Sequence, residues 1–263
     1  MVEHSENCVQ WVPVGVYLGI VLPAMIGFGL TGSPLLVVFA MPSVVALVLA
    51  VISRRRRTIF GDMGIRRAPV ASLAASALAP VAVTAAGVGV VIACGLGRLP
   101  TQWLLPIGAW HVLGGLRQGL FEEFGWRGFL QPRLTTLLGA HAAVLWTGLA
   151  WAVFHFGLII GGGTPGGVPL WMYLPVFTLT LVAVSVFAGY LRLVTGSVWP
   201  AVVLHAAANI AGGYADQVVV SLSHPAVAQM LGDAAGLLVW LTLAVWAWPR
   251  LSFPLREDRR IYA

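Results

Sequence analysis

This sequence has few charged residues. Of its 263 residues, 59% are hydrophobic and only 9% are charged, whereas a typical soluble domain has about 25% charged residues. Lysine is absent, so all 15 basic residues are arginines. This composition excludes a soluble globular domain and predicts an integral membrane protein. The net charge of +6 comes from arginines that cluster between apolar runs. That placement is typical of topology determinants, and we expect no nucleic-acid partner.

Cysteine is also scarce. The two cysteines, Cys8 and Cys94, have neither metal-binding nor redox spacing, so we expect no disulfide framework. The N-terminus carries Glu3 and Glu6 and lacks the basic lead of a signal peptide. We therefore expect the first apolar run to remain in the mature protein.

Long apolar runs fill most of the chain, and a membrane span needs about 20 such residues. Eight spans are expected, at approximately residues 11–30, 34–52, 70–94, 103–131, 142–160, 169–191, 198–213 and 234–248. Residues 214–232 are mixed in composition and are expected to form a loop or a segment lying on the surface. The predicted fold class is an all-α polytopic membrane protein, with residues 1–263 as a single domain and a polar site inside the helix bundle.

Arginine placement predicts the orientation. Residues 54–57 are four consecutive arginines, with Arg66 and Arg67 close behind, and such runs mark cytoplasmic loops. Arg133, Arg192 and the C-terminal arginines fall on the same side of an eight-span chain, and Arg98 falls on the other. We therefore expect a multi-pass protein of the cell membrane with both termini in the cytoplasm.

Glu122 and Glu123 are expected to be the only acidic residues inside an apolar region, where ionised carboxylates usually mark a functional site. Glu123 and Arg127 are four residues apart, so on a helix they share one face and can pair. Glu122 is rotated by about 100° from Glu123, toward a different neighbour. We expect Glu123 to be tethered by Arg127 and Glu122 to be free.

Two further spans carry polar pairs at helical spacing. His155 follows Trp151 by four residues, and Asn209 follows His205 by four. Each of these side chains could have a purely structural role, forming a hydrogen bond between helices that stabilises the protein by about 0.6–2 kcal/mol. Together, Glu122, the two histidines and Asn209 supply a base, a polarising group and hydrogen-bond donors, which can activate water at a carbonyl. His111, about three helical turns before Glu122, is a weaker candidate.

In order along the chain, these three motifs resemble those of the CAAX prenyl protease and bacteriocin-processing family (Abi), which includes the Rce1-type endopeptidases. The segment Gly196–Pro200 before the last motif is also similar to the family pattern. The resemblance covers about residues 105–212, the expected catalytic core. Trp151 stands where the family commonly has Phe, a change expected to affect packing around His155 more than chemistry.

The resemblance implies a core of eight membrane helices with the site on the fourth, fifth and seventh. It implies that Glu122 and His155 activate a water, and that His205 and Asn209 stabilise the oxyanion. Glu123 and Arg127 would then hold the site together.

Some descriptions of this family call it metal-dependent. Zinc is therefore the alternative to a site without a cofactor. Glu122, His155 and His205 could then be the three ligands. The sequence has no His-Glu-x-x-His helix, and each candidate ligand comes from a different span. We therefore expect no metal.

The leading hypothesis is an intramembrane endopeptidase acting on a peptide or a lipid-modified protein in the bilayer. The alternative is a non-catalytic membrane protein of the same fold, acting in bacteriocin self-immunity or as a scaffold. A proton-linked transporter would also use a buried carboxylate, but the sequence has no interrupted, mutually symmetric halves.

Overall fold

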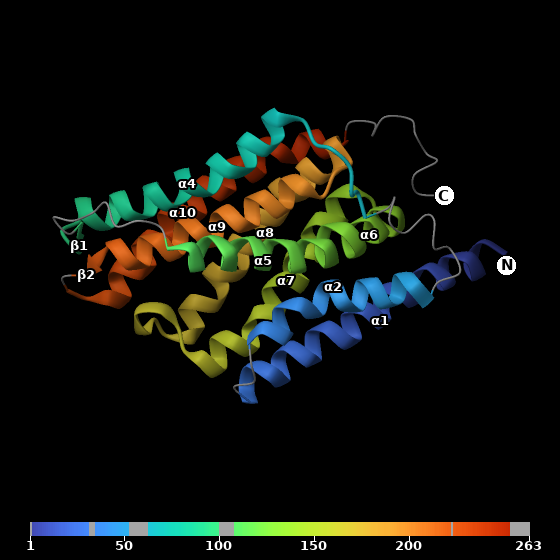
Figure 1. Ribbon diagram of the computed structural model, residues 1–263, viewed down its shortest axis with the longest axis horizontal. Coiled ribbons are helices and arrows are strands. Elements are labelled where there is room, and N and C mark those ends of the chain that lie inside the picture. Colours follow the sequence, from blue (N-terminus) through green and yellow to red (C-terminus); the bar gives the residue numbers. More distant parts are fainter. Residues whose placement is uncertain (1, 32–34, 53–62, 100–107, 222, 253–263) are drawn as a thin grey trace.

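The computed structural model describes residues 2–31, 35–52, 63–99, 108–221 and 223–252, and helices account for nearly all of them (Figure 1). The α-helices are α1 (Val2–Thr31), α2 (Leu35–Ile52), α4 (Val70–Ala93), α5 (Ala109–Glu123), α6 (Gln131–Leu138), α7 (Ala140–Gly162), α8 (Leu170–Thr195), α9 (Trp199–Val218) and α10 (Pro225–Ala247). A π-helix, η1 (Phe124–Leu130), joins α5 to α6, and short 3-10 turns η2 (Pro165–Gly167) and η3 (Trp248–Ser252) follow α7 and α10. The all-α polytopic class is confirmed.

Within the described residues, five helices are long and apolar enough to cross a membrane. They comprise Trp11–Thr31, Val70–Ala93, Ala140–Gly162, Leu170–Thr195 and Pro225–Ser252. Part of α2, Phe39–Ile52, is apolar but shorter. The expected fourth span is divided among α5, η1 and α6, and its beginning near residue 103 lies outside the described residues.

The expectation that residues 214–232 form a loop or surface segment is wrong. Helix α9 continues to Val218 and α10 begins at Pro225. A consequence is that Asp233 lies within a candidate membrane helix, so the glutamate pair is not the only acidic group in an apolar region. The helix accommodates this carboxylate because Gln229, one turn earlier, donates a hydrogen bond of 2.9 Å to it.

The segments that connect the helices contact one another at the two ends of the bundle. At one end, Arg66 Nε donates to the Gly196 carbonyl at 2.7 Å, which joins the start of α4 to the start of α9. At the other end, β1 (Gly97–Arg98) pairs antiparallel with β2 (Val220–Ser221), and the two lie together at the left of Figure 1. This grouping is the one expected if the chain crosses the membrane in alternating directions.

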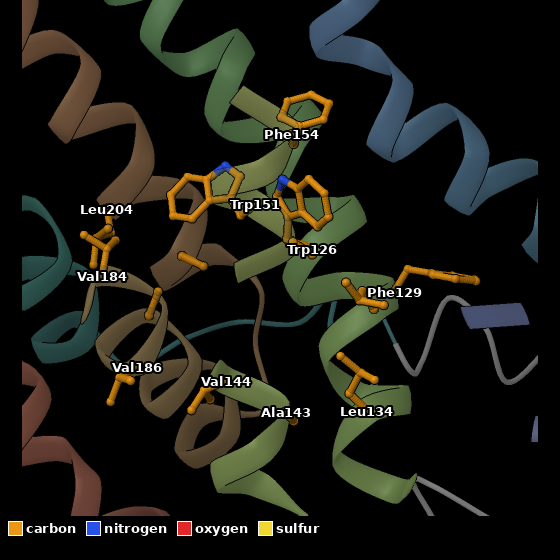
Figure 2. Packing of buried hydrophobic residues seen from close by; sticks show 14 of the residues in the cluster. Trp126, Phe129, Leu134, Ala143, Val144, Trp151, Phe154, Val184, Val186 and Leu204 are labelled. Carbon is orange, nitrogen blue, oxygen red and sulfur yellow. The ribbon is translucent and has the colours of Figure 1, made fainter. Parts of the chain in front are cut away.

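Glycines let the helices that carry the site approach closely. A Cβ atom at Gly119 of α5 would lie 2.7 Å from the Val202 carbonyl oxygen of α9. Gly157 and Gly161 of α7 pack in the same way against the α1 backbone around Gly29, so their small-residue spacing is used. One continuous core fills the bundle beyond these contacts, and Figure 2 shows Trp126, Trp151 and Phe154 within it.

Candidate active site

The acidic pair lies where α5 changes into the π-helix. Glu122 and Glu123 are the last residues of α5, and Arg127 lies inside η1. All three side chains are at most 1% exposed. Close packing constrains this segment, because a Cβ atom at Gly125 would lie 2.5 Å from both Pro42 and the Tyr17 hydroxyl. Single π-helical turns are common at functional sites.

Glu123 holds two cationic or polar groups with one oxygen. Arg127 Nη1 donates to Glu123 Oε1 at 2.9 Å, which confirms the expected pair. His205 Nδ1 lies 2.9 Å from the same oxygen. The spacing had not predicted this second contact. Through it Glu123 links α5 and η1 to α9 and orients the His205 ring.

Glu122 has a partner, although its position in the sequence had indicated that it would be free. Trp151 Nε1 of α7 donates a hydrogen bond of 2.7 Å to Glu122 Oε2. The structure therefore corrects the expectation that Trp151 acts mainly through packing, since a Phe at this position could not donate this bond. The Glu122 carboxylate is fixed by one oxygen, and its other oxygen, Oε1, has no partner of this kind among the described residues.

His155 is oriented by its own helix. Its Nδ1 lies 2.8 Å from the Trp151 carbonyl oxygen. A carbonyl only accepts hydrogen bonds, so Nδ1 carries the proton and Nε2 of the neutral ring is an acceptor. The ring packs between Phe154 and Phe177, with centroids 5.3 and 5.6 Å away.

Asn209 reaches back to α5 through a residue that the sequence interpretation missed. Its Nδ2 donates to Gln118 Oε1 at 2.6 Å. Gln118 precedes Glu122 by four residues, so the i, i+4 spacing that paired Glu123 with Arg127 could have identified it. The second hydrogen on Asn209 Nδ2 remains for another acceptor.

The structure thus brings together side chains from α5, η1, α7 and α9, and Trp151 lies among them. Its ring centroid is 5.2 Å from that of His205, and the Arg127 guanidinium carbon lies 4.5 Å from the Trp151 ring centroid. His111 does not join this cluster, because its Nε2 lies 3.2 Å from Gln217 Nε2 in a different contact between α5 and α9.

The alternative zinc site would consist of Glu122, His155 and His205. In the part of the chain that the structure describes, no group of three or more His, Cys, Asp and Glu side chains could hold a metal ion. The contacts that these three side chains make are hydrogen bonds, with the Trp151 indole, the Trp151 carbonyl and Glu123 respectively.

Residues 101–211 match the model of a family described as type II CAAX prenyl endopeptidase, Rce1-like. The matched stretch includes every residue of the cluster from Gln118 to Asn209. No curated protein matches the chain.

Proposed function

We propose that this protein is an intramembrane endopeptidase that hydrolyses a peptide bond in a membrane-associated substrate, as the match of residues 101–211 to the Rce1-like family model suggests. The observation that carries the proposal is the contact of two buried glutamates with two other helices, through Trp151 and His205. Buried carboxylates are costly in a membrane protein, and their hydrogen bonds keep them oriented toward one place.

Glu122 is the proposed general base. The Trp151 indole holds Oε2, so Oε1 can accept a proton from water. His155 Nε2 accepts the second water hydrogen and thereby orients the oxygen toward the substrate carbonyl. As the water oxygen bonds to the carbonyl carbon, Glu122 takes the proton. It then returns that proton to the leaving amine when the carbon–nitrogen bond breaks.

His205 and Asn209 are the proposed oxyanion donors. His205 donates through Nδ1 to Glu123, so it can donate through Nε2 only as an imidazolium. Asn209 supplies its second Nδ2 hydrogen, with Gln118 holding the first. Removing one such donor typically costs about 10²–10³-fold in kcat.

Arg127 completes the arrangement without touching the substrate. Its bond to Glu123 Oε1 supplies a positive charge beside the carboxylate that orients His205. In this mechanism no cofactor takes part, and the bilayer delivers the substrate. A prenylated protein tail is the substrate class that the family description suggests.

The experiment is cleavage of an internally quenched peptide ending in a farnesylated CAAX sequence, by the purified protein in lipid vesicles. We expect Glu122→Gln to abolish cleavage, since Gln cannot accept the proton. Asp216→Asn, the same chemical change at an exposed position of α9, should cleave at the wild-type rate. Equal rates for Glu122→Gln and wild type would remove the proposed base.

The absence of a metal from the mechanism has its own test. Elemental analysis of the purified protein is combined with activity after exhaustive chelation. We expect unchanged activity without stoichiometric zinc. Loss of activity on chelation, with recovery on adding zinc, would replace the glutamate mechanism by one in which Glu122, His155 and His205 are ligands.

A further inference from the structure

The π-helix leaves one backbone carbonyl beside the site without a helical donor. In an α-helix the Gln131 N–H would donate to Arg127, but here it donates to the Trp126 carbonyl. The next donor in π-helical register would come from residue 132, which is proline and has no N–H. The Arg127 carbonyl therefore needs a partner from outside its own helix.

Arg192 of α8 supplies that partner. Its Nε donates to the Arg127 carbonyl oxygen at 3.0 Å, and the side chain is only 2% exposed. The guanidinium packs against the backbone at Gly64, where a Cβ atom would lie 2.7 Å from its carbon Cζ. Gly64 has φ +71°, and its carbonyl accepts a hydrogen bond of 2.9 Å from the Val198 N–H.

This environment differs from that of an arginine that only sets membrane orientation. An orienting arginine is solvated in a loop, whereas Arg192 lies in the last turn of α8 and is buried. Its contact is with the backbone of the residue whose side chain holds Glu123. Arg192, Arg127, Glu123 and His205 thus form one continuous chain of contacts.

We propose that Arg192 is a positioning residue: by donating to the Arg127 carbonyl it fixes the π-helix so that Arg127 and Glu123 hold His205 in place. The activity part of this inference rests on the proposed function. Arg192 does not touch the substrate. Its effect on rate comes from the geometry of the helix that it holds.

The test compares two substitutions of equal length. Gln Nε2 is the same number of bonds from the backbone as Arg Nε, so Arg192→Gln keeps a donor at that place, while Arg192→Met fills the space without one. We expect Arg192→Met to lower kcat on the order of 10²-fold with KM unchanged, since small displacements in a site have effects of that size. Arg192→Gln should stay within a fewfold of wild type.

Pro132→Ala provides the rescue. It restores an N–H in register with the Arg127 carbonyl. The double variant Pro132→Ala with Arg192→Met should therefore have a kcat at least tenfold higher than that of Arg192→Met alone. Thermal unfolding of the four proteins follows the same order. Arg192→Met should melt several degrees below wild type, and the double variant should melt above Arg192→Met.

Two results would overturn the inference: equal behaviour of Arg192→Gln and Arg192→Met, or no recovery on adding Pro132→Ala. If the wild-type protein fails to cleave the farnesylated peptide, the proposed function fails on that probe. The order of melting temperatures still decides whether the hydrogen bond from position 192 holds the π-helix.

Discussion

Trp151 contacts the proposed base and the proposed water-orienting histidine through two different groups. Its indole N–H donates to Glu122, and its backbone carbonyl accepts from His155. The carbonyl contact survives any side-chain substitution, so the indole contact can be tested by itself. Hydrogen bonds to charged groups typically stabilise by about 1.5–3 kcal/mol.

We expect Trp151→Phe to remain folded and to lose about tenfold or more in kcat, because Glu122 loses the donor that fixes Oε2. Trp146→Phe is the matched control, since Trp146 lies on the same helix and is 54% exposed. The measurement is the rate of peptide cleavage by the two variants. Equal rates would show that the indole N–H is dispensable and that its role is packing.

Substitution of Glu123 should reduce the stability of the fold as well as the activity. In Glu123→Gln, the buried Arg127 keeps its charge but loses its carboxylate, which costs about 3–5 kcal/mol in comparable buried pairs. We expect a large fall in melting temperature for Glu123→Gln. Glu122→Gln should unfold close to wild type, because Gln still accepts the Trp151 hydrogen bond. Thermal unfolding in detergent measures both, and equal melting temperatures would contradict the division of roles between the two glutamates.

At the scale of the elements, the site depends on how closely α5 approaches α9. Gly119 faces the Val202 carbonyl, with no room for a methyl group, whereas a Cβ atom at Gly114 on the same helix would meet open space. Gly119→Ala should separate the helices around Glu123 and His205 and reduce both stability and cleavage. Gly114→Ala should keep both or gain slightly in stability, since Ala favours helix by about 1 kcal/mol over Gly. Unfolding and cleavage assays on the pair test this, and equal results would remove the close approach as a requirement.

Local spacing predicted those parts of the site that lie on one helix. The i, i+4 rule gave the Glu123–Arg127 pair, and apolar runs gave the positions of most helices. Contacts between helices, such as Glu122 with Trp151 and Glu123 with His205, were not predictable. Periodicity shows which residues share a face but not which helix that face meets.

The π-helix and the extent of α9 and α10 could not be predicted from the sequence for a related reason. Nothing in the spacing of residues 124–130 distinguishes a π-helix from an α-helix, because packing around Gly125 and the donor from Arg192 stabilise it from outside. Residues 214–232 are mixed in composition, with several polar residues among the apolar ones, which favoured a loop. The helices persist because Asp216 lies exposed and Asp233 is bonded to Gln229.

At the scale of the whole molecule, the connections fall at opposite ends of the bundle. The start of α4 contacts the start of α9 through Arg66 and Gly196. The connection after α7 lies near the start of α10, because a Cβ atom at Gly166 would be 2.7 Å from the Pro225 carbonyl oxygen. Residues 54–57, the four-arginine run, lie outside the described residues. Their charge makes the Arg66 end the cytoplasmic one in our proposal.

Cysteine labelling tests this orientation. Cys94 is exposed, so the starting protein carries Cys8→Ala and Cys94→Ala. New cysteines at Arg67 and at Gly162, both at exposed positions, report on the two ends. In intact cells a membrane-impermeant maleimide should label Gly162→Cys but not Arg67→Cys, and after permeabilisation it should label both. Labelling of the two sites from the same side would contradict the alternation of spans between α4 and α7. Labelling of Arg67→Cys alone would reverse the orientation, and the site would then receive substrates from the opposite leaflet.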